Sequence, residues 1–214
     1  MKVIITGATG MIGEGVLLYC LKDPSITSIL SVSRKSTGIQ DPKLAEYLVP
    51  DFVNLQFPDA TLSGYDACFF CAGVSSVGMS KADYYRNTYE ATMQFAKAID
   101  PKTDMTFIYV SGEGTNDKGW QSWARLKGQV ENELAKLGFK QTYNYRFGLV
   151  KPFPQQKHAH PYYKYMKPLL PFFKAVFPGM YNTMEEVAAS MLKITHHPYP
   201  KHIIYAKDIK KIIS

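Results

Sequence analysis

The residues near the start of the chain that could do chemistry are three glycines, Gly7, Gly10 and Gly13. They follow a short β-branched apolar run, Lys2 to Thr6, and lead into a helix-compatible run, Met11 to Leu21. Glycine at a strand-to-helix turn permits unusual backbone angles, close approach of backbone N–H groups to a phosphate, and close packing of helix on strand. A pyrophosphate would then lie at the helix N-terminus, where unpaired N–H groups and the helix dipole favour negative charge.

The glycine spacing predicts the phosphate-binding turn of a dinucleotide site, because the required strand and helix stand on either side of it. The alternative is a glycine-rich turn that binds no ligand. The residues expected to contact a cofactor in this turn are Gly7, Thr9, Gly10, Met11, Ile12 and Gly13.

A second candidate for anion recognition follows the expected second strand, Ile26 to Ser33. A dinucleotide-binding fold that takes NAD places an acidic residue here, where it binds the adenosine ribose hydroxyls. Residues 24 to 40 contain no acidic residue, and Arg34 and Lys35 follow the strand instead. Their cationic groups suit a ribose 2′-phosphate. We therefore expect a preference for NADP(H) over NAD(H); the alternative is that both are solvated loop charges.

The order Gly-x-x-Gly-x-x-Gly within TGATGMIG resembles the short-chain dehydrogenase/reductase superfamily, in particular its extended and atypical branch of NAD(P)-binding epimerase-like and reductase-like proteins. Within that branch the chain is most similar to the small Tat-interacting-type oxidoreductases and their bacterial relatives. The resemblance covers most of the chain and is clear to about Val150. It implies an α/β fold, a doubly wound and mostly parallel Rossmann sheet of about seven strands with helices on both faces.

The resemblance also implies one domain over residues 1–214, with 151–214 as a small substrate-side portion. After the second strand, hydrophobic patterns predict further strands at Phe52–Phe57, Tyr65–Cys71, Met105–Val110, Gln141–Phe147 and His202–Ala206. They predict helices at Asp83–Ile99, Ser122–Leu134 and Met184–Thr195. In the family, the helix that corresponds to Asp83–Ile99 commonly forms a dimer face, which makes a homodimer an expectation here.

Two further segments would approach the cofactor if the resemblance holds. The central strand ends in Cys71, Ala72 and Gly73, whose small side chains let the backbone come close to a dinucleotide. The segment after the sixth strand resembles an Arg-Pro-Gly pattern of the family, with Phe147 in place of the proline. Candidate contacts to the nicotinamide are therefore Gly148, Leu149 and Val150.

The family's catalytic groups are a serine at the end of the fifth strand and a Tyr-x-x-x-Lys pair on the next helix. The matching serine is Ser111, and the matching pair is Trp123 and Lys127. In the family the lysine holds the nicotinamide ribose and lowers the tyrosine pKa, so that the phenol exchanges a proton with the substrate. An indole N–H has no accessible acid–base equilibrium, so Trp123 cannot replace the phenol.

Three accounts of this departure stay open. Another tyrosine, such as Tyr84 or Tyr85, could supply the proton; water could supply it in a slow reaction; or the protein could bind NADP(H) without turnover, as a sensor or partner-binding module. For Lys127 the alternative is a surface pair with Glu131, four residues further along the helix.

The amino-acid composition limits the classes of protein to which this chain could belong. The 214 residues are 46% apolar and 20% charged, as in ordinary globular domains. The formal net charge of +7 is spread along the chain without a dense run, which disfavours nucleic-acid binding. Three cysteines are too few for a disulfide framework, and Cys68 and Cys71 are expected to be small buried hydrophobes rather than a metal site. With no signal-type segment and no membrane-length apolar run, a cytoplasmic location is expected.

The segment from Lys151 to Tyr181 is proline-rich, basic and aromatic. Four interpretations compete for it: a substrate lid, a partner surface, a weak membrane-surface patch and plain core packing. His158 and His160 lack the spacing of a helical metal pair and are expected to be loop residues. The substrate itself is not predicted, because fold and cofactor do not determine the reaction.

Overall fold

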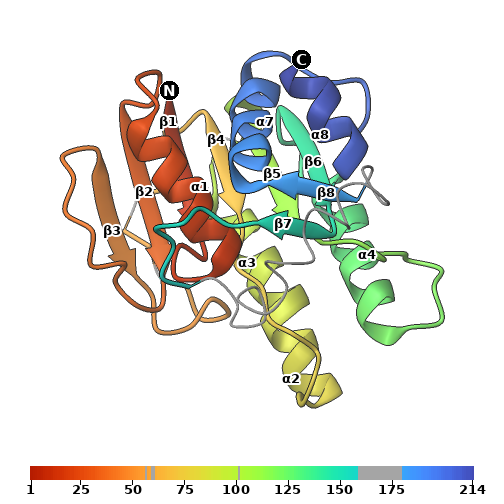
Figure 1. Ribbon diagram of the computed structural model, residues 1–214. Coiled ribbons are helices and arrows are strands. Elements are labelled where there is room, and N and C mark those ends of the chain that lie inside the picture. The colour runs from red at the N-terminus through yellow and green to blue at the C-terminus, as the bar shows by residue number, and fades with distance from the viewer. Residues whose placement is uncertain (56, 59–60, 101, 159–179) are drawn as a thin grey trace.

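The computed structural model describes residues 1–214 except 56, 59–60, 101 and 159–179. Its centre is a seven-stranded sheet in the order β3-β2-β1-β4-β5-β6-β9, in which every neighbouring pair is parallel (Figure 1). The strands are β1 (Lys2–Thr6), β2 (Ser28–Ser33), β3 (Leu44–Leu48), β4 (Ala67–Phe70), β5 (Thr106–Val110), β6 (Gln141–Arg146) and β9 (Ile203–Tyr205). A second parallel pair consists of β7 (Leu149–Lys151) and β8 (Tyr181–Thr183).

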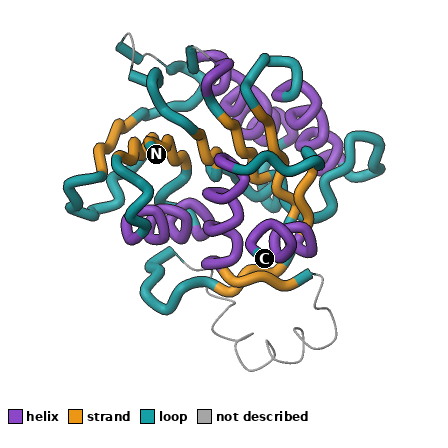
Figure 2. Tube along the Cα trace, turned by 90° about the horizontal axis from the view of Figure 1, so that it is seen from above, coloured by secondary structure: helices purple, strands orange, loops and turns teal. Residues whose placement is uncertain are grey.

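Helices cover both faces of the large sheet (Figure 2). On one face lie α1 (Met11–Lys22), α7 (Met184–His196) and α8 (Ala206–Ile213). On the other lie α3 (Ala91–Ala98) and α4 (Ser122–Leu134), with α2 (Lys81–Tyr85) and a π-helical turn, η1 (Arg86–Glu90), leading into α3. A short 3-10 turn, η2 (Lys102–Asp104), precedes β5. The predicted doubly wound sheet is confirmed.

The two cores follow from the alternation of side chains along the buried strands. Val3 and Ile5 of β1 pack in one core with Val16 of α1 and Met184 of α7, whereas Ile4 points into the other core with the α3 residue Phe95. Both faces of β1 are thus apolar, as expected for a strand at the centre of a parallel sheet. This packing fixes α1 against β1 and so fixes the turn between them.

The prediction of a third strand at Phe52–Phe57 is wrong. The strand is β3, Leu44–Leu48, which pairs with β2 and forms an edge of the sheet. Its residues are half-buried or exposed, so it lacks the apolar run that marks the central strands. Phe52 instead enters the core from an irregular segment, where its ring lies 5.9 Å from that of Phe95.

The helix predicted at Asp83–Ile99 is interrupted. It begins earlier, at Lys81, where Ser80 caps it by accepting a hydrogen bond from the Asp83 N–H at 3.1 Å. In η1 the Ala91 N–H donates to the Arg86 carbonyl, five residues back, which widens the helix by one residue. Helical periodicity in the sequence could not reveal this local change of hydrogen bonding.

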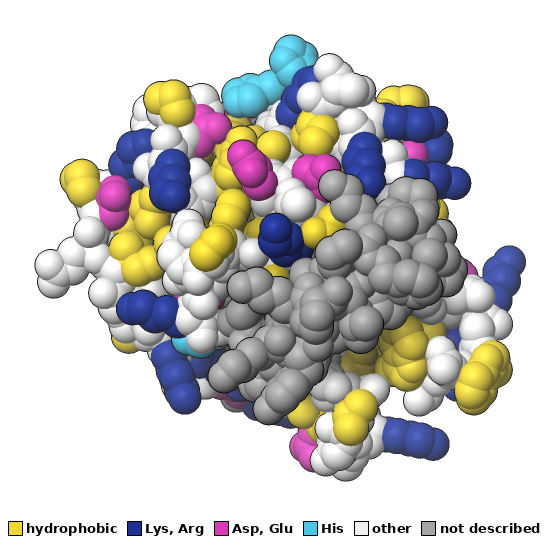
Figure 3. Space-filling view, in the orientation of Figure 1, with side chains coloured by type: hydrophobic (Ala, Val, Ile, Leu, Met, Phe, Trp, Pro, Cys, Tyr) yellow, Lys and Arg dark blue, Asp and Glu magenta, His cyan; other side chains and the backbone are white. Residues whose placement is uncertain are grey.

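Charged side chains are dispersed over the visible surface, and Lys and Arg form no single stripe there (Figure 3). Within the described ranges, none of the helices combines the length and the apolar character needed to cross a membrane. The prediction of a lid, partner surface, membrane patch or core segment at Lys151–Tyr181 falls largely on residues 159–179, which lie outside the described residues, as does His160.

Candidate functional site

A cleft of about 480 Å³ opens at the carboxyl ends of β1, β2 and β4. Ligands in open α/β sheets bind at this edge, where the strand order reverses direction on either side of β1. Seven of the residues predicted to contact a cofactor line the cleft: Gly7, Thr9, Gly10, Arg34, Cys71, Ala72 and Gly73. The structure therefore brings the glycine turn, the end of β2 and the end of β4 together.

The glycine turn has no room for side chains. Gly7 has φ +70°, and a β-carbon placed on it would lie 2.7 Å from the Ala72 amide nitrogen. A β-carbon on Gly13 would overlap the Gly7 carbonyl group and lie 2.9 Å from the Ala8 nitrogen. Such distances are shorter than real β-carbon contacts, so both positions require glycine. The helix is thereby drawn tightly onto the end of β1.

The N-terminus of α1 is open to an anion. Gly10 is its N-cap residue, and none of the described side chains caps the helix there, while the Gly10 N–H donates to the Gly7 carbonyl at 2.9 Å and closes the turn. The N–H groups of Met11, Ile12 and Gly13 belong to the first turn, which has no intrahelical partners for them. The cradle closed by Gly7 and the uncapped helix end fit a pyrophosphate.

The end of β4 is tied to β1 beside this turn. The Ala72 N–H donates to the Thr6 hydroxyl at 3.1 Å, which holds the Cys71–Gly73 backbone against the glycine turn. Burial raises the pKa of the Cys71 thiol to about 12. Cys68 is fully buried in the strand. Cys68 is therefore a small buried packing residue, as predicted, whereas Cys71 is half-buried and lines the cleft.

At the end of β2 the two predicted cations separate. Both residues are exposed, but Arg34 lines the cleft and Lys35 is not among the lining residues. The Ser33 hydroxyl donates to the Lys35 carbonyl at 2.6 Å and turns the chain at this point. This turn leaves Arg34 at the cleft and Lys35 away from the described lining.

Among the polar and aromatic cleft residues that sequence reasoning missed, four lie away from the ends of β1, β2 and β4. They are Asp51 and Phe52, which follow the edge strand, and Arg86 and Asn87 of the π-helical turn. Asp51 accepts hydrogen bonds from the Val53 N–H at 3.0 Å and pairs with Arg86. Asp51 was missed because β3 was predicted eight residues too late, so its position after the strand was not recognised. Arg86 and Asn87 were missed because the hydrophobic periodicity does not mark a π-turn.

The predicted contacts Gly148, Leu149 and Val150 do not line this cleft. Leu149 and Val150 belong to β7, and Val150 is buried in the core. The chain after β7 returns to the start of α1 instead: the Gln156 side-chain amide donates to the Met11 carbonyl at 2.6 Å. Their contact with the nicotinamide stays a prediction.

The same segment is held by a buried carboxylate. Glu14, 5% exposed, accepts hydrogen bonds from the backbone N–H groups of Lys157 and His158, each at 2.7 Å. The His158 ring also lies 3.2 Å from this carboxylate. His158 is thus a loop residue, as predicted, and its contacts with Glu14 hold the loop against α1.

Ser111 and Lys127 lie together at the end of β5. The Lys127 ammonium donates to the Ser111 carbonyl at 2.8 Å. Burial lowers the pKa of Lys127, and the charge of Glu131 opposes this effect. Ser111 is 1% exposed, and its hydroxyl lies 3.4 Å from the Tyr145 carbonyl. The pair has the proximity that the family resemblance implies, but it lies outside the described lining of the cleft.

Glu131 is not the partner of Lys127. It forms a bidentate pair with Arg146, in which the Arg146 Nε donates to Oε1 at 2.9 Å and Nη2 pairs with Oε2. Arg146 Nη1 also lies 3.3 Å from the Tyr205 hydroxyl. The alternative interpretation of Lys127 as half of a surface pair is therefore not what the structure shows.

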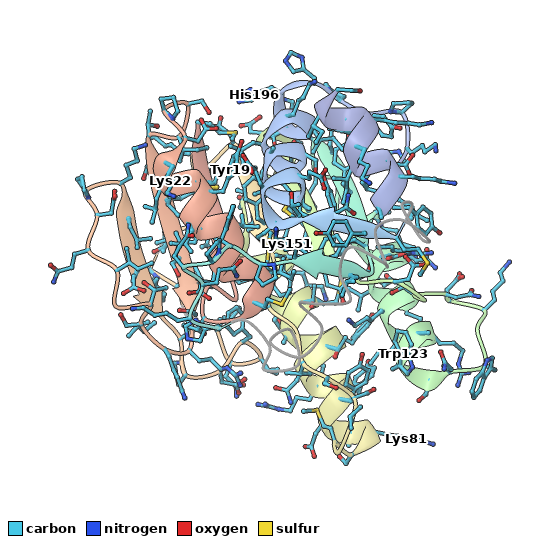
Figure 4. All side chains as sticks on the ribbon, viewed as in Figure 1. Tyr19, Lys22, Lys81, Trp123, Lys151 and His196 are labelled. Carbon is cyan, nitrogen blue, oxygen red and sulfur yellow. The ribbon has the colours of Figure 1, made fainter. Side chains whose placement is uncertain are left out.

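Trp123 lies in the first turn of α4, and Lys81 begins α2 at the same end of the molecule (Figure 4). The indole ring lies against the turn after β5, where its Cη2 would be 3.0 Å from a β-carbon on Gly114. Tyr84 is 6% exposed and shares a hydrogen bond with Thr88 that opposes the rise of its pKa on burial. Tyr85 is 42% exposed and stacks on Tyr89, with ring centroids 5.1 Å apart.

The strand order 3-2-1-4-5-6, with a glycine turn between β1 and α1, defines the class of Rossmann-type dinucleotide-binding folds. The model of the NAD dependent epimerase/dehydratase family matches residues 3–120, which is more than half of the chain. The chain therefore belongs to this family.

The chain is also similar to two fungal proteins. The chain is 24% identical over 159 residues to "Protein fmp52, mitochondrial" of Emericella nidulans, across 70% of this chain and 66% of that protein. It is 24% identical over 154 residues to "Protein FMP52, mitochondrial" of Candida glabrata, across 65% and 59%. The match thus spans 59–66% of these relatives' own length, less than two thirds.

Among solved structures, UDP-glucuronic acid 4-epimerase from Bacillus cereus in complex with NAD aligns with a TM-score of 0.68 at 14% identity, over 96% of this chain and 76% of that one. At this identity the likeness bears on the fold. The expectation of a cytoplasmic location is contradicted, because the names of the fungal relatives place those proteins in mitochondria. Sequence reasoning had inferred location from a missing signal pattern, which is an indirect argument.

Proposed function

We propose that this protein binds NADP(H) in preference to NAD(H), with the adenosine half of the cofactor in the cleft and its pyrophosphate at the N-terminus of α1. The observation that carries the proposal is the tight backbone turn at Gly7 and Gly13, beside a helix end that no side chain of the described residues caps. The preference is supported by Arg34 in the lining and by the lack of an acidic residue between positions 24 and 40. Asp51 is the acidic residue in the lining, and Arg86 pairs with it.

The proposed activity is a slow or altered oxidoreductase or epimerase-like reaction. When bound, a nicotinamide dinucleotide supplies or accepts a hydride. Lys127 would hold the nicotinamide ribose, and Ser111 would orient a carbonyl or hydroxyl of the substrate. Trp123 would occupy the place of the family tyrosine and would exclude water there without exchanging a proton. The pairing of Lys127 with the end of β5 supports these assignments.

Replacing Lys127 by alanine is expected to abolish any turnover. The assay follows NADPH and NADH oxidation with a panel of aldehydes, ketones and quinones, and NADPH should be consumed faster. The Lys127 side chain holds the chain after β5 through the Ser111 carbonyl, so its loss removes both a charge and an anchor. The exposed Lys136, which pairs with Glu133 on the helix surface, offers a matched control as Lys136→Ala. Turnover that survives Lys127→Ala unchanged would contradict the assigned role.

A second candidate function is a cofactor-binding sensor or partner-binding module that performs no chemistry. The observation in its favour is that the Trp123 ring packs on the turn after β5, because the family resemblance leads us to expect a phenol at this position. Neither Tyr84, which is buried, nor Tyr85, which stacks on a neighbouring ring, is an evident replacement. Tight NADPH binding with no turnover on any substrate of the panel would favour this candidate. A homodimer stays an expectation from the family resemblance.

A further inference from the structure

The cleft contains an ion pair that contributes little to stability. Arg86 Nη2 pairs with Asp51 Oδ2, and their side chains are 42% and 28% exposed. Solvent screens such pairs, which typically contribute about 0–1 kcal/mol to folding. Both residues line the cleft. A role in ligand binding explains their position better than a role in stability does.

Asp51 carries a negative charge in this lining. The backbone N–H of Val53, at 3.0 Å, and the Arg86 guanidinium hold its pKa below the usual value. The Asn54 side-chain amide donates a further hydrogen bond at 2.9 Å. An unpaired carboxylate in the same cleft as Arg34 would repel the 2′-phosphate that Arg34 attracts.

The π-helical turn η1 places Arg86 close to the Asp51 carboxylate. Arg86, Asn87 and Ala91 all line the cleft, and the hydrogen bond from the Ala91 N–H to the Arg86 carbonyl is the one that makes this turn a π-helix. Such a bond joins residues five apart and places them on one side of the helix. Single π-turns inside helices are found frequently at functional sites.

We propose that Arg86 determines cofactor specificity, by neutralising Asp51 so that Arg34 faces a ribose 2′-phosphate without an opposing carboxylate. This inference rests on the proposed function, because it concerns the same cleft and the same cofactor. The inference assigns the cofactor preference to Asp51, which follows β3, and to Arg86 of η1, as well as to Arg34 at the end of β2. Arg34 attracts the ribose 2′-phosphate, and Arg86 neutralises the Asp51 carboxylate that would repel it.

The test compares dissociation constants for NADPH and NADH, measured by calorimetry, in the wild type and in Arg86→Gln, Asp51→Asn and the double variant. Arg86→Gln should weaken NADPH binding about tenfold and leave NADH binding within about twofold. The reason is that an unpaired Asp51 opposes the ribose 2′-phosphate, which NADPH carries and NADH lacks. Asp51→Asn should not weaken NADPH binding. The double variant should recover most of the loss. Lys97→Gln, which removes an exposed charge on α3 outside the lining, is the matched control.

The outcomes separate the two claims. If the wild type binds neither dinucleotide, the proposed function fails. If the wild type prefers NADPH but Arg86→Gln keeps the same NADPH-to-NADH ratio, or weakens both equally, the role of Arg86 fails while the proposed function stands. A loss in Arg86→Gln that Asp51→Asn does not restore would show that Arg86 acts without Asp51, which also overturns the inference. Circular dichroism of each variant checks the fold.

Discussion

Replacing Gly13 by alanine should weaken NADPH binding about 10- to 100-fold, the effect expected from an overpacking cost of ~1–3 kcal/mol. The added β-carbon would overlap the Gly7 carbonyl group and lie 2.9 Å from the Ala8 nitrogen. Because these are backbone atoms, the clash can be relieved only by moving α1 away from β1. The N–H groups at the start of α1 would then no longer converge on a phosphate. Calorimetric titration with NADPH measures the effect.

The control for this variant is Gly138→Ala. Gly138 has φ +78° and nothing lies within 4 Å of the site of its β-carbon, so alanine there strains the backbone without a clash. Gly138 lies between α4 and β6, outside the cleft lining. The control should lose some stability and keep the wild-type affinity for NADPH. Wild-type affinity in Gly13→Ala would contradict the role assigned to the turn.

Replacing Arg146 by methionine should lower the free energy of unfolding by about 3–5 kcal/mol, the usual effect of removing one partner from a buried ion pair. The Glu131 side chain is 4% exposed and that of Arg146 is 12% exposed, so the variant leaves a carboxylate buried without its guanidinium. Urea denaturation followed by circular dichroism provides the measurement. This pair joins α4, the helix that also carries Lys127, to β6.

Two controls make this result specific. Lys136→Met breaks the pair between Lys136 and Glu133, whose side chains are 67% and 38% exposed, and should cost less than about 1 kcal/mol. The double variant Glu131→Leu, Arg146→Met removes both charges and should be much less destabilised than Arg146→Met. A double variant as unstable as the single one would mean that packing, and not the unpaired charge, accounts for the loss.

The sequence predicted the central strands and the glycine turn because both have strong local causes. Lys2–Thr6 is apolar on both faces, and Gly7 and Gly13 mark a turn that has no space for a β-carbon at either position. The helices Ser122–Leu134 and Met184–His196 were equally visible, the second through its Thr183 cap, whose hydroxyl accepts from the Glu186 N–H at 3.1 Å. These features are encoded within a few residues.

The remaining parts of the site depend on contacts between distant segments. Asp51 follows an edge strand without an apolar pattern, and Arg86 reaches it across 35 positions of sequence from a π-turn that periodicity does not mark. Lys35 follows Arg34 directly, and only the three-dimensional turn at Ser33 separates their directions. The return of residues 156–158 to Glu14 is likewise a long-range contact.

The most direct test of the central claim is a fluorescence titration of the purified protein with NADPH and NADH in parallel. The glycine cradle and the pairing of Asp51 with Arg86 predict saturable binding of both, with the lower dissociation constant for NADPH. Binding of NADH as tight as, or tighter than, that of NADPH would contradict the proposed preference. Binding of neither dinucleotide would contradict the proposed cofactor site itself.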